Sequence, residues 1–397
     1  MRKKFVKFPA RRAIWINEWL SVLKLFLYSA ITEEDPGYSG YYRQKYSKNL
    51  SDFLSKEKGY VFPACSGTNA LYIALKAIPK TETKNVVHVS AITDPGSIAA
   101  IIDAGYKINV IDSESPQDGQ SSLSSLKNAL NRFKTSSAAF LLVHHAGWLS
   151  TNIYEFKRTC QQYNCAFIED ISQAHGAKLE DEIVGSFGDI SAGSTMYRKN
   201  FVTGGCGGFV YTQDKLINQE VMLHGDRGKP IWQNNFYDNF LSNRDGNNVK
   251  FSALNHAIDN ISLAIGISSL SRLPKTIEKR QRIVNSIKEK INRKLNLIFP
   301  NSEKISPSPF IIPITFNSAE QKKLVVNCLL ENQIPFNPDY RFLVSDWGWI
   351  KQHLVEDSLY PKNARKYLDM SIFLYLNERY SAKNCSIIAE LINKSLA

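Results

Sequence analysis

The sequence predicts an α/β protein in which helices sandwich a mostly parallel sheet, followed by a smaller C-terminal α+β domain. Between residues 60 and 212, short apolar stretches of strand type alternate with stretches of helical spacing. Such alternation is typical of crossover units, which make the strands parallel. The length of 397 residues suggests two domains. We place an N-terminal arm at 1–35, a large α/β domain at 36–245, and helices with the small domain at 246–397.

The N-terminal arm begins basic and becomes apolar, as a signal peptide does. Asn17, Glu18 and Lys24 interrupt the apolar part, and no small-residue cleavage site is convincing, so neither a leader nor a transmembrane segment is predicted. An amphipathic helix is predicted instead by apolar residues at helical spacing, namely Trp15, Trp19, Val22, Leu23 and Phe26. We expect this helix to dock on the protein body, and contact with a membrane surface is the alternative.

In the large domain, the sequence predicts a succession of strands and helices separated by turn residues. Strands are expected at 60–65, 85–91, 108–112, 138–145, 165–170 and 207–212, and helices at 69–78, 97–105, 121–133 and 153–164. A polar hairpin is expected at 176–185, and the aperiodic segment 227–250 reads as a long functional loop. Two helices, 256–273 and 276–296, then lead to a strand at 309–316 and the small domain.

Composition narrows the possible partners. The net charge of +12 favours anionic partners such as phosphates, whereas the scattering of lysine and arginine along the whole chain argues against nucleic acid. The six cysteines form no CxxC pair and no histidine pair completes a zinc set, so no metal is expected. Reduced thiols in a cytoplasmic protein are the plain interpretation.

Candidate site residues follow the ends of the predicted strands, where open α/β sheets bind their ligands. Gly67 and Thr68 begin a helix whose first amides can hold an anion. Asp170 ends an apolar strand, and Ser194 and Lys199 follow another. Taken singly, these features also fit a helix cap, a structural ion pair and a surface lysine.

Together the features are more specific than any one of them. A phosphate site at a helix start, a carboxylate at a strand end and a lysine beside a hydroxyl describe a pyridoxal phosphate (PLP) pocket. The phosphate needs amides and hydroxyls, and the pyridine nitrogen needs an acid. The aldehyde needs an amine to which it can bond.

Four stretches resemble the DegT/DnrJ group of sugar aminotransferases, PLP enzymes of the aspartate aminotransferase fold (fold type I). They are "ACSGTNALYIAL", "IEDISQAHGA", "VGSFGDISAGSTMYRKNFVTGGCGGFVYT" and "NHAIDNISLAIGISSLSRL". The resemblance implies that Lys199 is the lysine bonded to the cofactor. It also implies that Asp170 faces the pyridine nitrogen and that Gln173 lies near the ring hydroxyl.

The same resemblance assigns the phosphate site. It implies that Gly67, Thr68 and Ser194 hold the phosphate, and that Asn255 reaches it from the neighbouring subunit of a homodimer. The implied reaction transfers an amino group, with L-glutamate as the expected donor, to a keto-sugar linked to a nucleotide. Such a reaction belongs to amino-sugar and cell-surface polysaccharide biosynthesis.

Several positions depart from the family pattern. Asp94 stands where an aromatic residue usually packs on the cofactor ring, and Ala257 replaces a common arginine. Met196 and Tyr197 replace the usual His-Pro pair before the lysine. Two alternatives therefore stay open: a PLP-binding regulatory protein without turnover, and a sugar dehydratase of the same fold. The resemblance argues against the dehydratase, because histidine replaces the lysine in those relatives.

Overall fold

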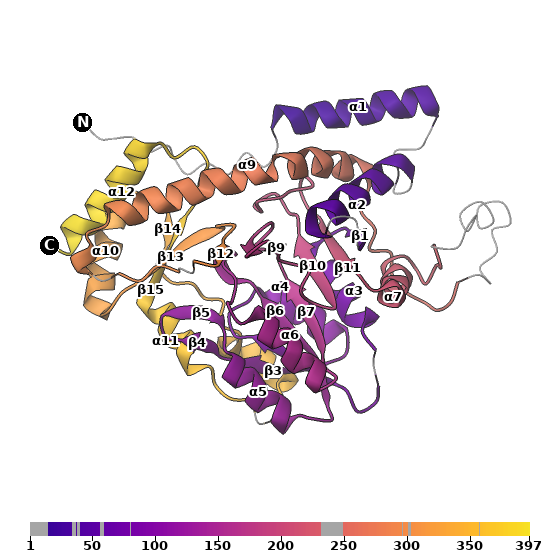
Figure 1. Ribbon diagram of the computed structural model, residues 1–397, viewed down its shortest axis with the longest axis horizontal. Helices are drawn as coiled ribbons and strands as arrows, with labels where there is room; N and C mark the ends of the chain where they lie inside the picture. Colours follow the sequence, from indigo (N-terminus) through magenta and orange to yellow (C-terminus); the bar gives the residue numbers. More distant parts are fainter. Residues whose placement is uncertain are drawn as a thin grey trace.

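The computed structural model describes residues 15–397 except 34–36, 38, 39, 56–58, 80, 232–248, 296, 301, 302 and 357. The expected α/β class is confirmed, because a central sheet lies between two layers of helices (Figure 1). Residues 232–248 of the expected loop at 227–250 lie outside the described residues, as does residue 245 at the proposed domain boundary. The domain boundaries therefore remain predictions.

The central sheet has seven strands within the described part of the chain, in the order β1-β11-β10-β7-β6-β2-β3. Strand β11 is antiparallel to both of its neighbours, whereas β10, β7, β6, β2 and β3 pair in parallel. Parallel strands bring their carboxyl ends to one edge, which is where the candidate residues gather. The bounds are β1 Tyr60–Ala64, β2 Val86–Ser90, β3 Lys107–Ile111, β6 Ser137–Val143, β7 Ala166–Asp170, β10 Ile190–Ser194 and β11 Gly208–Thr212.

Two apolar clusters pack the two faces of this sheet. Phe167 and Ile168 are adjacent in β7 but belong to different clusters, because successive strand residues point to opposite faces. One face is covered by α3 (Gly67–Ala77), α4 (Pro95–Asp103) and α7 (Lys215–Gly225). The other is covered by α2 (Gly40–Ser55), α5 (Leu123–Arg132), α6 (Ile153–Gln162) and the first half of α9 (Asn260–Lys290).

Helix α9 corrects the expectation of two separate helices. It runs without a break through Pro274 for 31 residues. A proline inside a helix costs about 3 kcal/mol, because it removes a backbone hydrogen bond and crowds the preceding turn. Leu273 and Ile277 are buried on either side of it, and burying each such side chain contributes about 1.5–3 kcal/mol. Tertiary packing therefore outweighs the local signal.

Helix α1 (Ile16–Thr32) confirms the expected N-terminal helix and lies along α9 (Figure 1). The expectation that the helix docks on the protein body is confirmed, but it does not dock through its apolar stripe, because Trp19, Leu23 and Phe26 are exposed. The helix instead buries Leu25 and Glu18, and the Glu18 carboxylate pairs with Arg272 of α9 at 2.9 Å. Among the described residues, no helix is both long and apolar enough to cross a bilayer.

The C-terminal part is built around a three-stranded antiparallel sheet of β13 (Ile311–Thr315), β15 (Ser371–Tyr375) and β14 (Phe336–Asn337). Helices α10 (Ala319–Glu331), α11 (Lys362–Met370) and α12 (Ala382–Ser395) accompany it, as expected for an α+β unit. The expected polar hairpin is present as β8 (Lys178–Leu179) and β9 (Glu182–Ile183), which pair with each other, and β8 also pairs with β12 (Ile305–Ser306). A small two-stranded sheet joins β4 (Ser113–Ser115) to β5 (Asp118–Ser121).

Candidate functional site

A cavity of about 190 Å³ lies at the carboxyl ends of the parallel strands. The structure brings together there six of the seven site residues chosen from the sequence. They come from α3, the end of β7 and the turn after it, the end of β10 and the segment after β10: Gly67, Thr68, Asp170, Gln173, Ser194 and Lys199. The seventh, Asn255, does not line it and is exposed.

The two adjacent carboxylates at the end of β7 have different surroundings. Glu169 is fully buried and accepts hydrogen bonds from the amides of Phe187 and Gly188 at 2.9 and 2.7 Å. It also accepts from the amide of Gly185 and meets His144 Nε2 at 3.0 Å. Glu169 therefore holds the loop after β9 in place.

Asp170 points into the cavity instead. One carboxylate oxygen accepts from Ser97 Oγ at 3.0 Å, and the other accepts from the Ser172 amide at 3.0 Å. The residue is 4% exposed, so its charge is largely desolvated and oriented by these two donors. A carboxylate held in this way can stabilise a cationic ring nitrogen.

The first turn of α3 lies very close to β10. A Cβ atom on Gly67 would lie 2.4 Å from Ser194 Cβ, so only glycine allows this approach. Ser66 caps the helix by accepting from the Asn69 amide at 3.1 Å. The first turn and the Ser194 side chain thus line one wall of the cavity, and a helix start of this kind suits a phosphate group.

Gln173 is held from two sides. Its Oε1 accepts from the Ala146 amide at 2.8 Å, and its Nε2 donates to the Tyr340 hydroxyl at 3.5 Å. Ala146 belongs to the 3₁₀ turn His145–Gly147 and has a φ of 62°, which aims its amide at the glutamine. These contacts fix the glutamine amide at the edge of the cavity.

Lys199 lies where this cavity meets a larger one of about 560 Å³. Its Nζ lies 5.0 Å from the centre of the Phe310 ring. The buried His175 is close enough to be affected: burial, with a smaller contribution from the charge of Lys199, lowers the pKa of His175 to about 3. The imidazole is therefore neutral near pH 7, and it adds no positive charge beside the lysine.

The larger cavity was not predicted from the sequence. Its aromatic walls come mainly from the C-terminal part, through Phe310, Tyr340 and Phe373. Burial raises the pKa of Tyr340 to about 12, so its hydroxyl keeps its proton. No local pattern marks these residues, because only the packing of β13 and β15 brings them to Lys199. Ser97 and Ser172 were also missed, although Ser172 lies two residues after the chosen Asp170.

Asp94 lines both cavities, as its position in the family pattern suggested. It is the N-cap of α4, and its Oδ1 accepts from the Gly96 amide at 2.8 Å. The positive end of the helix therefore offsets part of its charge.

The glycine run after Lys199 reaches the cavity, and Asn255 bonds within its own loop. Gly207 lines the cavity, and a Cβ there would lie 1.9 Å from Thr203 Oγ1. Asn255 Oδ1 accepts from the Ala257 amide at 3.1 Å. Within the described ranges, no group of three His, Cys, Asp or Glu side chains could hold a metal ion.

These donors and acceptors fit pyridoxal phosphate by their chemistry. Glycines in the cavity lining allow close approach to the backbone, a helix start with Ser194 suits a phosphate, and Asp170 suits a pyridine nitrogen. Lys199 opens both to this cavity and to the larger one, which gives its amine access to a second molecule.

Comparisons with known proteins point the same way. The model of the DegT/DnrJ/EryC1/StrS aminotransferase family matches residues 27–392. GDP-perosamine synthase of Escherichia coli O157:H7 is 26% identical over 299 residues, which cover 75% of this chain and 76% of that protein.

Solved structures match over almost the whole chain. NtdA from Bacillus subtilis with bound cofactor PMP superposes with a TM-score of 0.83 at 19% identity, covering 100% of this chain and 87% of that one. GDP-4-keto-6-deoxymannose-3-dehydratase with a trapped PLP-glutamate geminal diamine gives 0.83 at 18% identity, covering 97% and 100%. At these identities the likeness shows the shared fold.

Proposed function

Because the chain belongs to the DegT/DnrJ/EryC1/StrS aminotransferase family, whose enzymes use pyridoxal 5'-phosphate, we propose that it moves an amino group from an amino acid to a keto-sugar. The donor is L-glutamate and the acceptor is a nucleotide-linked keto-sugar in this proposal. The product serves amino-sugar and surface polysaccharide biosynthesis in the cytoplasm. The observation that carries the proposal is the meeting of Lys199 and Asp170 in one cavity.

The cofactor, when bound, supplies an electron sink for the carbon that carries the amine. Asp170 holds a proton on the ring nitrogen, because its carboxylate is desolvated and already oriented by Ser97 and Ser172. Gly67, Thr68 and Ser194 hold the phosphate. Gln173 orients the ring hydroxyl from its position between Ala146 and Tyr340.

Lys199 is the catalytic base of the proposed reaction. With the cofactor in place, its amine would be the group that holds the cofactor's aldehyde carbon, and as a free amine it would take and return the proton of the amine-bearing carbon. The larger cavity beside it takes the sugar, because its aromatic walls and the Tyr340 hydroxyl suit a ring with apolar and polar faces. The net charge of +12 favours a substrate that carries a diphosphate.

The test begins with colour and covalent attachment. Purified protein is expected to be yellow, and borohydride treatment is expected to fix the cofactor on the peptide that contains Lys199, as read by mass spectrometry. Lys199→Ala should lose both the attachment and the formation of 2-oxoglutarate from glutamate with a keto-sugar. Lys178→Ala, at an exposed lysine of β8, is the matched control and should keep both. Turnover by Lys199→Ala would contradict the assignment.

The same assay separates the alternatives. A dehydratase would consume glutamate and release a deoxy-sugar without a new amine, which mass spectrometry of the product distinguishes. A regulatory protein would be coloured but would leave every keto-sugar unchanged. Lys199 favours transamination, since an amine at this position can both bond to the cofactor and move the proton.

The homodimer is also a proposal, and it rests on Asn255. This side chain is exposed in one subunit and does not line that subunit's own cavity, so it is available to a partner's phosphate site. Lys199→Ala and Asn255→Asp are each expected to be inactive. Mixed dimers of the two should regain activity, because one of their two sites then has both residues intact. Mixtures that stay inactive would argue against a shared site.

A further inference from the structure

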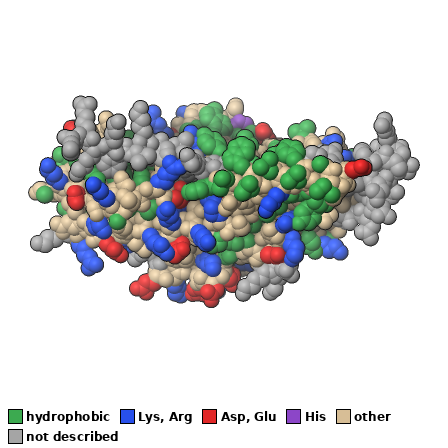
Figure 2. Space-filling model, turned by 90° about the horizontal axis from the view of Figure 1, so that it is seen from above, with side chains coloured by type: hydrophobic (Ala, Val, Ile, Leu, Met, Phe, Trp, Pro, Cys, Tyr) green, Lys and Arg blue, Asp and Glu red, His purple; other side chains and the backbone are tan. Residues whose placement is uncertain are grey.

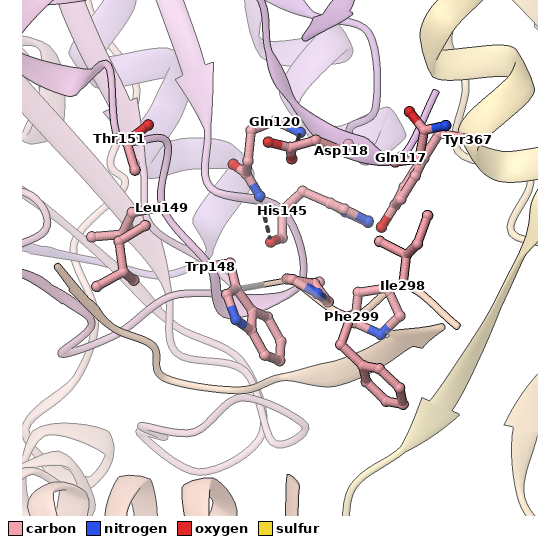
Figure 3. A pocket seen from close by; sticks show the side chains of 15 residues that line it. Gln117, Asp118, Gln120, His145, Trp148, Leu149, Thr151, Ile298, Phe299 and Tyr367 are labelled. Atoms are coloured by element: carbon pink, nitrogen blue, oxygen red, sulfur yellow. Dashed lines mark hydrogen bonds between the residues drawn. The ribbon is translucent and has the colours of Figure 1, made fainter. Parts of the chain in front are cut away.

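A third cavity, of about 280 Å³, has no role in the proposed reaction. It lies between the large domain and the C-terminal part, and it shares no lining residue with the two cavities around Lys199. Figure 3 shows Gln120, Trp148 and Phe299 around it, contributed by β5, the segment after the His145–Gly147 turn and the segment after α9.

Two buried polar atoms at this cavity have no hydrogen-bond partner within the protein. They are Gln120 Oε1 and His145 Nε2, on side chains of residues that are 7% and 2% exposed. The orientation of Gln120 is set by its Nε2, which donates to the His145 carbonyl at 3.2 Å (Figure 3). A buried acceptor without a donor is unfavourable, so a ligand that donates a hydrogen bond to it is favoured.

The other lining groups indicate which ligand would donate. The carboxylate of Asp118 is a further acceptor, and Trp148 and Tyr367 present aromatic surface. Burial lowers the pKa of His145 to about 3, so its ring is neutral and can pair with a hydroxyl. Several acceptors beside aromatic rings suit a ring that carries many hydroxyls on an apolar frame.

We propose that this cavity binds a sugar ring, separately from the substrate site beside Lys199. Gln120, Asp118 and His145 accept its hydroxyls, and Trp148 covers one of its faces. One turn connects this cavity to the cofactor site. The His145–Gly147 turn lines the cavity, and its Ala146 amide donates a hydrogen bond to Gln173.

Calorimetric titration of the holoenzyme with D-glucose and D-glucosamine tests the proposal. Gln120→Leu is expected to weaken binding by about threefold to tenfold, the loss of one hydrogen bond. Asp118→Asn, at an exposed residue that tolerates the change, should also weaken it, whereas Gln352→Leu, at an exposed glutamine elsewhere, should not. Binding that responds to Tyr340→Phe and not to Gln120→Leu would assign the sugar to the substrate cavity and overturn the proposal. The absence of heat with either sugar would overturn it as well.

A separate observation concerns α1, which exposes the residues that an amphipathic helix normally buries. At 100° per residue, seven of its apolar side chains occupy one arc of roughly 140°. We call this the apolar face of α1, and Figure 2 shows hydrophobic side chains gathered in one patch on this side of the molecule. Its members, 46–81% exposed, are Ile16, Trp19, Leu20, Leu23, Phe26, Leu27 and Ile31.

The orientation of α1 is held by a charged contact. Glu18 is fully buried and meets the guanidinium of Arg272 at 2.9 Å, while Leu25 packs on the same side. Turning the apolar face inward would expel Glu18 from this pair, and breaking a buried ion pair is strongly destabilising. The exposure of the apolar face is therefore built into the docking of the helix.

Charge indicates what covers this face. The sequence directly before α1, residues 1–14, contains six lysines and arginines and no acidic residue, although it lies outside the described residues. Tryptophan and a basic flank beside an apolar arc suit an anionic lipid surface.

We infer that the apolar face of α1 lies on an anionic membrane surface, with the helix parallel to the bilayer plane. Sedimentation with vesicles of phosphatidylcholine and phosphatidylglycerol in a 3:1 ratio tests this, and vesicles of phosphatidylcholine alone test the charge requirement. The protein is expected to sediment with the anionic vesicles, and less so as salt is raised.

The variants for this test keep the ion pair intact. Leu20→Gln, Leu23→Gln and Leu27→Gln together should lower the bound fraction more than tenfold. Leu216→Gln with Leu359→Gln, at leucines that are each 72% exposed elsewhere, should leave it unchanged. Equal binding by both variants would overturn the inference. A halved molecular mass of the triple variant in light scattering would do the same, since it would assign the face to a second copy.

Discussion

Replacing Gly67 by alanine tests the geometry of the cofactor site most directly. A Cβ atom at this position would lie 2.4 Å from Ser194 Cβ and 2.9 Å from Ser194 Cα. Non-bonded carbon atoms prefer about 3.5–4.0 Å, so the first turn of α3 or the end of β10 has to move by about 1 Å. Neither atom belongs to the far end of a flexible side chain, so the strain falls on the backbone.

Two effects of different size follow from this shift. Overpacking of this kind costs about 1–3 kcal/mol of folding stability. The larger effect is on the site, because displacing catalytic or binding groups by 1 Å can cost about 100-fold in rate. We therefore expect Gly67→Ala to fold, to bind PLP much more weakly and to lose most of its activity.

The assay is titration of the apoprotein with PLP, followed by absorbance, together with urea denaturation. Gly205→Ala is the matched control, because a Cβ there would meet nothing within 4 Å and the residue is exposed. We expect Gly205→Ala to behave as the unchanged protein. Equal PLP affinity of the two variants would refute the reasoning that α3 and β10 together form the phosphate site.

Three further predictions concern buried ionisable side chains. Glu169→Gln should cost about 3 kcal/mol in urea denaturation because it weakens several bonds to a buried carboxylate, whereas Asp170→Asn should cost less than about 1.5 kcal/mol yet abolish activity. If Asp170→Asn lost stability and Glu169→Gln lost activity, Glu169 would be the acid of the site and Asp170 the structural one. Burial lowers the pKa of His88 to about 4 and of His145 to about 3, so the unfolded chain binds more protons below pH 6.5. Lowering the pH from 7 to 5 should therefore reduce the free energy of unfolding by about 2 kcal/mol for each of these two histidines. A urea midpoint that stays constant from pH 7 to 5 would contradict this. Arg280→Met should destabilise by about 3 kcal/mol in the same measurement, because the fully buried guanidinium bonds to Glu378. An unchanged midpoint would show that this pair contributes little.

Much of the large domain could be predicted because its signals are local. The strand that ends in Asp170 is a short apolar run, and Ser66 with Gly67 marks a helix start. Each of these elements can therefore be predicted from a few neighbouring residues. The carboxyl-end rule for parallel strands then places Asp170 and Ser194 at one edge without knowledge of the packing. The roles assigned to the site residues came from family resemblance, and they stay predictions until tested.

Other features depend on partners far away in the chain. Pro274 is a local stop signal, and α9 continues through it because apolar residues on both sides find a core to enter. The apolar stripe of α1 predicted the helix correctly but not which face of it is buried. The face that contains Glu18 is buried instead, because Glu18 pairs with Arg272 of α9.

What the sequence by itself determined was the order of strands and helices and the chemical groups available at the strand ends. Periodicity and backbone preferences act over a few residues, so they can be recognised in the chain alone. Tertiary structure decided which aromatic side chains enclose Lys199 and which face of α1 meets solvent. Each of these is a competition between burial and solvation, and only the arrangement of distant segments determines its outcome.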